Sequence, residues 1–149
     1  MLKLPLSREK NSQFGVNRFE PEFLLKPRVL LSLRNPVNGK AGKIRGFVDT
    51  AADACHIGAR LAAELGLQAT GDPGAKVWGA SGSFEVKPTL VEMEVLGEDS
   101  APYAAFGRKS TQFYLQPNVE DVILGVRGFL DQLAEVRLDY RGGVLTLVA

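Results

Sequence analysis

The residues with the clearest chemical potential form the triplet Asp49-Thr50-Ala51, which directly follows the mainly apolar run 44–48. Such a run is typical of a buried strand, so we expect the triplet at the end of one. A carboxylate in that position can take a proton from water. An alternative is that Asp49 is only a turn former or helix cap, because an aspartate side chain accepts nearby backbone N–H groups.

If the carboxylate activates water to hydrolyse a peptide bond, a second carboxyl group is needed, and the two groups share one proton. Two carboxylates about 3 Å apart cannot both ionise, which separates the apparent pKa values of the pair by roughly three units in pepsin. A second, loosely similar triplet, Asp99-Ser100-Ala101, follows Gly97 and precedes Pro102, so we interpret it as a polar loop. The partner of Asp49 is therefore predicted to be Asp49 of a second copy of the chain.

The order of three motifs resembles the retropepsin-like aspartic proteases. They are the triplet at 49–51, a glycine-containing stretch at 77–86 and the apolar turn Ile123-Leu124-Gly125, which precedes Phe129-Leu130. The resemblance spans about residues 28–149. It implies a mainly β, closed and barrel-like fold with one or two short helices. It also implies a homodimeric aspartic endopeptidase that hydrolyses a peptide or protein substrate with water activated by the paired aspartates.

The resemblance assigns roles residue by residue. Asp49 would activate water, and Thr50 would hydrogen-bond across the dimer axis. Ala51 departs from the usual glycine, and its methyl group is expected either to narrow the pocket or to require a dihedral that alanine disfavours. Asp53 would hold substrate backbone amides, although a solvated turn acid is an equally good interpretation. The residues expected to bind substrate are Ala52, Asp53, Trp78, Gly79, Ala80, Ser81, Gly82 and Ile123.

The stretch 77–86 has two strand-like flanks around a small centre, which predicts the tip of a hairpin. In the resembled family this hairpin is the flap, whose tip amides hold substrate carbonyl groups. An ordinary surface hairpin is the alternative. Trp78 favours the flap, because a large aromatic side chain beside the tip can cover a peptide and exclude water.

The elements that must position these residues follow from periodicity and turn chemistry. Residues 29–33 and the segment before Asp49 predict a hairpin around the turn at 35–40. After the flap, the apolar pattern changes phase between Leu90 and Val91, which predicts a bulge or a change of facing. The other expected elements are a helix carrying Ile57, Leu61 and Leu65 with a left-handed cap at Gly66, a buried strand at 122–124, a short helix near 129–133 and a terminal hairpin at 136–147.

Composition narrows the class of protein. A formal net charge of +1, with Lys and Arg scattered through both halves, argues against a nucleic-acid surface. The apolar runs stop short of the roughly 20 residues that a membrane span needs, and the N-terminus lacks a signal core, so a cytoplasmic location is the default expectation. His56 is the single histidine, which excludes a histidine-rich metal site within one chain, and no cofactor is expected.

Cys55 is the single cysteine and lies next to His56. A thiolate–imidazole nucleophile is disfavoured, because neighbours in extended structure point to opposite faces, and we expect Cys55 to be buried. Residues 1–27 are predicted to form an N-terminal extension that is mobile, laid across the body or processed, ahead of a protease domain at 28–149. The alternative function is a catalytically silent, homodimeric peptide-binding module of the same fold.

Overall fold

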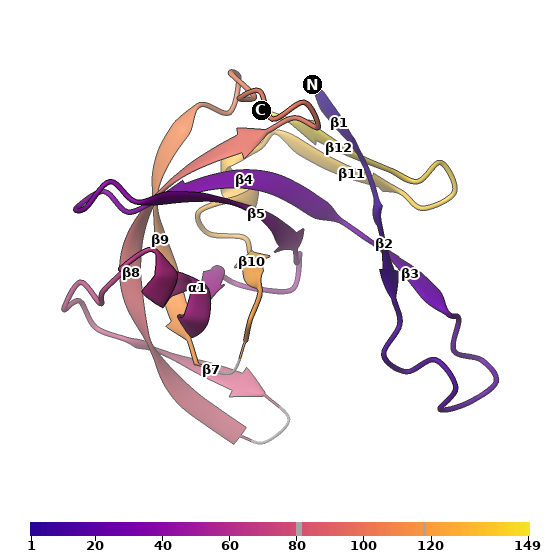
Figure 1. Cartoon of the computed structure of the whole chain (residues 1–149), viewed down its shortest axis with the longest axis horizontal. Helices are drawn as coiled ribbons and strands as arrows, with labels where there is room; N and C mark the ends of the chain where they lie inside the picture. The colour runs from indigo at the N-terminus through magenta and orange to yellow at the C-terminus, as the bar shows by residue number, and fades with distance from the viewer. Residues whose placement is uncertain (80–81, 118) are drawn as a thin grey trace.

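The computed structural model of the chain describes residues 1–79, 82–117 and 119–149. These residues form mainly β-structure, with one short α-helix and one 3-10 turn, which confirms the expected fold class (Figure 1). The elements are β1 (Leu2–Pro5), β2 (Ser7–Lys10), β3 (Phe23–Lys26), β4 (Arg28–Arg34), β5 (Ala41–Val48), β6 (Cys55–Gly58), α1 (Ala59–Glu64), β7 (Ala75–Gly79), β8 (Gly82–Leu96), β9 (Arg108–Gln116), β10 (Val122–Leu124), the 3-10 turn Leu130–Gln132, β11 (Glu135–Asp139) and β12 (Val144–Val148).

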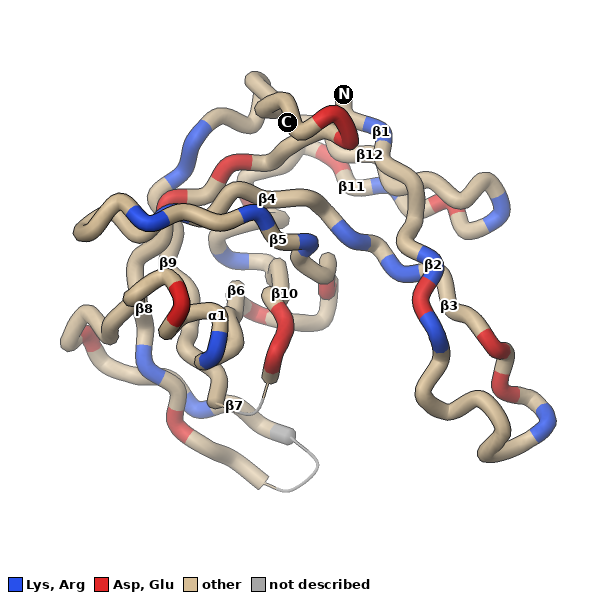
Figure 2. The backbone as a smooth tube through the Cα atoms, viewed as in Figure 1, with Lys and Arg blue, Asp and Glu red and all other residues tan. Residues whose placement is uncertain are grey.

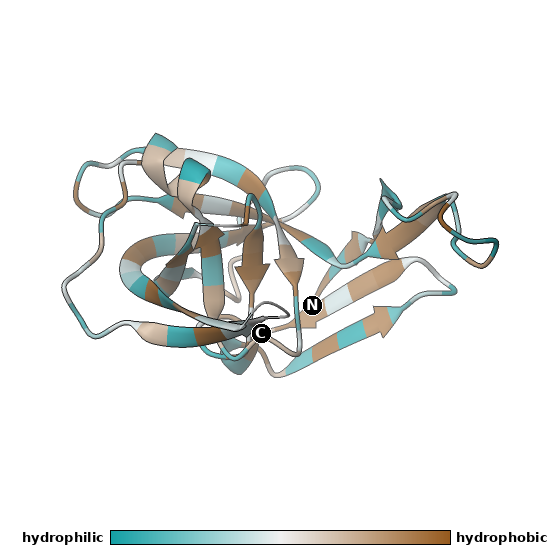
Figure 3. Ribbon diagram, turned by 90° about the horizontal axis from the view of Figure 1, so that it is seen from below, coloured by the Kyte–Doolittle hydropathy of each residue, from teal (hydrophilic) through white to brown (hydrophobic). Residues whose placement is uncertain are grey.

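The body is one sheet with the strand order β4-β5-β10-β6-β9-β8-β7. Because β4 also pairs with β8, six of these strands form a closed ring of hydrogen-bonded neighbours. The main core fills this ring. In β4, for example, Val29, Leu31 and Leu33 are fully buried while the residues between them are less so, as a period-two strand requires. Figure 3 shows hydrophobic positions concentrated on the strands.

The two ends of the chain meet in a second sheet, with the order β1-β12-β11. Leu4 from the N-terminal strand is buried with Leu145 and Leu147 from β12. Strands β2 and β3 then form a separate hairpin that projects away from the body (Figure 1). Basic and acidic positions are interspersed along this hairpin and along the body strands (Figure 2).

Arg28 links the base of the projecting hairpin to the body. Its guanidinium donates to Glu9 of β2 at 2.8 Å and to Asp121, ahead of β10, at 2.7 Å and 2.6 Å. The hydrogen bond from Arg28 lowers the pKa of Glu9 to about 2. The pair therefore contributes stability when Glu9 is ionised.

Several local predictions are confirmed, and one is corrected. Antiparallel β4 and β5 form the expected hairpin, and Gly66 has the predicted left-handed φ of 66°. The helix, however, starts at Ala59, so Ile57 was wrongly placed in it. Ile57 belongs to β6, where it pairs with Leu115 and Val122. The apolar spacing did not reveal this boundary, because the strand and the helix both pack their apolar residues into the same core.

The phase change in β8 is a change of facing. Val86 packs with Ala54 and Tyr114 in a small separate cluster, whereas Val91 and Met93 face the main core. The register with β9 is continuous from Lys87 to Glu94, so this part of the strand contains no bulge. In the described residues, no helix is both long and apolar enough to span a membrane.

Candidate active site

Asp49 directly follows β5, at the end where β5 runs parallel to β10. β5 pairs with β10 so that Val48 lies opposite Leu124. The backbone N–H of Asp49 continues this pairing and donates to the carbonyl oxygen of Leu124 at 3.0 Å, while the N–H of Val48 donates to Pro27 at 2.9 Å. Asp49 is thus the first residue beyond β5, in which Gly46 and Val48 are buried and the other residues are half-buried or exposed. Its backbone is fixed from a distant part of the chain.

The loop after Asp49 is held by the segment that follows β10. The N–H of Val126 donates to the carbonyl oxygen of Ala52 at 2.8 Å, and the N–H of Arg127 donates to that of Asp53 at 2.9 Å. Gly125 lies against this loop so closely that a Cβ there would overlap the carbonyl oxygen of Ala54. The apolar-glycine turn therefore supports the Asp49 loop because the two backbones approach without a side chain between them.

The Asp49 carboxylate takes part in a local turn. Its Oδ1 accepts the N–H of Ala51 at 2.9 Å. In the described part of the chain, Ser100 is the only non-glycine residue with a positive φ, so Ala51 adopts an ordinary backbone conformation. The predicted alternative of a disfavoured dihedral at Ala51 is therefore wrong, and its methyl group instead lines the adjacent hollow.

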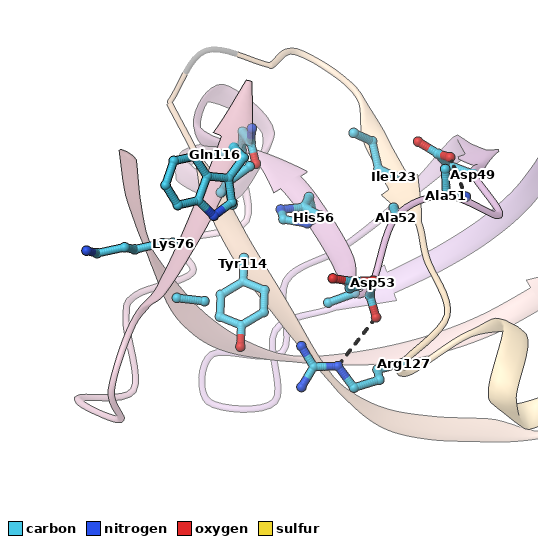
Figure 4. A pocket seen from close by; sticks show the side chains of 14 residues that line it. Asp49, Ala51, Ala52, Asp53, His56, Lys76, Tyr114, Gln116, Ile123 and Arg127 are labelled. Carbon is cyan, nitrogen blue, oxygen red and sulfur yellow. Dashed lines mark hydrogen bonds between the residues drawn. The ribbon is translucent and has the colours of Figure 1, made fainter. Parts of the chain in front are cut away.

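A hollow of about 390 Å³ opens beside Asp49 (Figure 4). Six of the residues expected from the sequence line it: Asp49, Ala51, Ala52, Asp53, Trp78 and Ile123. Thr50 is exposed and does not line the hollow. Gly79 and Gly82 pair at the end of the β7–β8 hairpin, and Gly82 does not line the hollow. Ala80 and Ser81 lie outside the described residues.

Sequence reasoning missed other residues that line the hollow, among them His56, Lys76, Tyr114, Gln116 and Arg127. The signal for three of them is the sheet register. β6 and β9 run parallel with His56 opposite Tyr114, and His56 also pairs with Ile123 of β10. Gln116 has the same strand parity as Tyr114 and so shares its face. The missing information was which strands are neighbours.

His56 is a half-buried titratable group in this wall. Burial lowers its pKa, while the neighbouring Gln116 amide and the charge of Asp49 act in the opposite direction. The ring lies 5.7 Å from the Tyr114 ring. Gln116 is close but does not meet hydrogen-bond geometry: among the described residues, His56 Nδ1 and Gln116 Oε1 have no partner. The wall therefore presents a neutral imidazole near neutral pH.

Cys55, next in sequence to His56, faces the opposite side of β6. It is fully buried, as expected, and its Sγ donates to the carbonyl oxygen of Arg127 at 3.5 Å. Burial raises the pKa of the thiol to about 11. A thiol with this pKa is protonated at neutral pH, so Cys55 is not a nucleophile. In the described ranges, no group of three or more His, Cys, Asp and Glu side chains is arranged to hold a metal ion.

The chain is similar to known proteins in structure rather than in sequence. No family model and no curated protein matches the sequence. The crystal structure of a retropepsin-like aspartic protease from Rickettsia conorii matches with a TM-score of 0.56 at 16% identity, covering 97% of this chain and 98% of that chain. EIAV protease bound to an inhibitor matches with a TM-score of 0.49 at 16% identity, covering 73% of this chain and 86% of that chain. The first of these shows that the chain has the retropepsin-like fold.

Proposed function

We propose that the chain is an aspartic endopeptidase, active as a homodimer in which two Asp49 carboxylates share one proton. The observation that carries the proposal is the position of Asp49. It is the first residue beyond β5, its backbone is anchored to Leu124, and it borders a hollow of about 390 Å³. The retropepsin-like fold supports the same assignment.

The chemistry requires two carboxyl groups with different protonation. One Asp49 takes a proton from water, which attacks the peptide carbonyl carbon, and the other donates a proton to the carbonyl oxygen. Each copy supplies one carboxyl group, so a two-fold symmetric pair gives each Asp49 an identical partner. Thr50 is exposed beside Asp49 and is available to hydrogen-bond with the second copy.

The remaining site residues would bind an extended peptide. Ala52 and Ile123 offer apolar contact within the hollow, and the exposed Asp53 carboxylate is available to accept backbone amides. Trp78 is 78% exposed and lines the hollow from β7, so a bound peptide would cover its ring. In this proposal the tip amides, from Gly79, Ala80, Ser81 and Gly82, hold substrate carbonyl groups.

A homodimeric peptide-binding module that lacks turnover is the second candidate. It is favoured by the hydrogen bond from the Ala51 N–H to Asp49 Oδ1, which is the contact of a turn-forming aspartate. The Ala51 methyl group also occupies space beside this carboxylate. Both features are compatible with peptide binding and neither requires hydrolysis.

Incubation with a denatured protein substrate at about pH 4 to 6 separates the candidates. The wild type should cleave, Asp49→Asn should not, and Asp99→Asn, which changes the loop triplet, should cleave like the wild type. Equal cleavage by the wild type and Asp49→Asn would refute the catalytic assignment. No cleavage by the wild type with retained peptide binding would favour the module. Sedimentation analysis should show a dimer.

The division into an extension at 1–27 and a protease domain at 28–149 belongs to the same proposal. Because β1 pairs with β12 and Leu4 is buried, removal of the extension would uncover Leu145 and Leu147. Self-processing would therefore change the terminal sheet. Mass spectrometry of aged protein should show trimming in the wild type but not in Asp49→Asn; an unchanged mass in both would discard processing.

A further inference from the structure

The hollow beside Asp49 adjoins a second one. This second hollow, of about 300 Å³, shares Ala54, Tyr114 and Arg127 with the first. Its other lining residues are Lys109, Ser110, Thr111, Gln112, Gly128 and Gln132. A peptide that occupies the first hollow and extends past Arg127 would therefore enter the second.

Arg127 is fixed at the boundary between the two hollows. Its backbone N–H donates to the carbonyl oxygen of Asp53 at 2.9 Å, and its Nε contacts the same oxygen at 3.4 Å. Its own carbonyl oxygen accepts the Cys55 thiol. Figure 4 shows the guanidinium group extending toward Tyr114. The backbone and Nε are thus held, which leaves the terminal nitrogens for a ligand.

Two cationic side chains, Lys109 and Arg127, line the second hollow. Within the described residues, neither Arg127 nor Lys109 forms a salt bridge. The nearby acids are Asp53, exposed at the first hollow, and Asp131, whose Oδ1 already accepts the N–H of Gly128 and the amide of Gln132. Because Lys109 and Arg127 both line this hollow, an anion that enters it would be attracted by two positive charges.

We propose that the second hollow is an outer subsite that binds an acidic side chain of the peptide, between Arg127 and Lys109. This rests on the proposed function, because the same peptide must cross the first hollow. A guanidinium group suits a carboxylate, since its planar N–H donors can form two parallel hydrogen bonds with it. The substrate class is thus an extended peptide with Asp or Glu a few residues from its central apolar pair.

The test uses Asp49→Asn protein, so that binding is measured without turnover. Fluorescein-labelled peptides carry a central apolar pair and a single Glu moved one position at a time, with a matched Gln series, and affinity is read by fluorescence polarisation. At one position the Glu peptide should bind about tenfold more tightly than its Gln counterpart, a difference of about 1.4 kcal/mol. Adding salt to about 0.5 M should reduce this preference, because both charges are partly in water.

Lys109→Gln and Arg127→Gln, each made in the Asp49→Asn background, should reduce the preference for Glu severalfold. Arg60→Gln removes the same charge from α1, where Arg60 is exposed and lines neither hollow, and should leave the preference intact. If Arg127→Gln fails to fold, Lys109→Gln and the Glu/Gln comparison still decide the question. Equal affinity for Glu and Gln at every position, or no binding at all, would overturn the subsite.

This result is independent of hydrolysis. A Glu preference in Asp49→Asn together with an inactive wild type would keep the acidic subsite and reject the endopeptidase. Cleavage by the wild type without any Glu preference, in either binding or rate, would keep the endopeptidase and reject the acidic subsite.

Discussion

The backbone N–H of Asp49 donates to the carbonyl oxygen of Leu124 at 3.0 Å, which joins the candidate catalytic residue to a short strand far along the chain. The next residue, Gly125, lies directly against the loop that Asp49 begins. The position of the carboxylate is therefore set by two segments together. Changes in the second segment should affect activity without touching the acid itself.

Gly125→Ala is expected to disturb this junction. An added Cβ would overlap the carbonyl oxygen of Ala54, so backbone must move, and we expect a loss of about 2 kcal/mol in unfolding free energy together with loss of any activity. Gly42→Ala is the matched control, because its Cβ would meet Leu65 at an ordinary 3.7 Å. Urea unfolding measures both variants. Equal stability of the two variants would contradict the close approach of Gly125 to Ala54.

Cys55 should be unreactive in the folded protein. Burial raises the pKa of its thiol to about 11, so at about pH 8 it remains a thiol, whereas an exposed cysteine is partly thiolate. A chromogenic disulfide reagent should react slowly with native protein and rapidly after unfolding in urea. The chain has a single cysteine, so the signal is unambiguous. Rapid labelling of the native protein would show that the structure around Cys55 opens.

Glu9 should contribute to acid stability. Its hydrogen bond with Arg28 lowers its folded-state pKa from 4.5 to about 2, so the contribution is present above pH 4.5 and is lost as pH falls toward about 2. Glu9→Gln should therefore be less stable than the wild type near neutral pH, and the difference should vanish at about pH 2. Urea unfolding across pH measures it, with the exposed Glu22→Gln as control. A difference that grows on acidification would contradict this sign.

The single histidine offers a direct probe of the site. Burial holds the pKa of His56 below its ordinary 6.5, and the charge of Asp49 partly offsets this. Asp49→Asn should therefore lower the pKa of His56 further, and Asp53→Asn should change it less. An NMR titration of the imidazole protons measures each variant. An upward shift in Asp49→Asn would contradict the predicted effect of the Asp49 charge on His56.

Trp78 should report peptide binding. It is the single tryptophan and is 78% exposed beside the hollow, so its fluorescence should be that of a hydrated indole. A peptide that covers the ring should shift the emission to shorter wavelength in Asp49→Asn. Trp78→Phe should remove this signal while polarisation still detects binding. Saturating peptide without a change in emission would mean that β7 does not cover the ligand.

Local patterns were enough to predict much of the fold. The hairpin before Asp49, the buried strand at 122–124 and the terminal hairpin all follow from period-two burial and turn residues, which are properties of short segments. The error at Ile57 has the same origin, because a spacing of four residues cannot reveal that Ile57 pairs with Leu115 and Val122. Strand neighbours that are distant in sequence leave no such local trace.

The sequence by itself determined which residue types stand at the end of this strand, and so it singled out Asp49 and the loop that follows. The tertiary structure alone decided what surrounds them. Parallel pairing of β6 with β9 brings His56 beside Tyr114, and the turn after β10 places Arg127 where two hollows meet. The reason is physical: register and strand order are fixed by packing of the whole core, whereas turn and strand propensities act over a few residues.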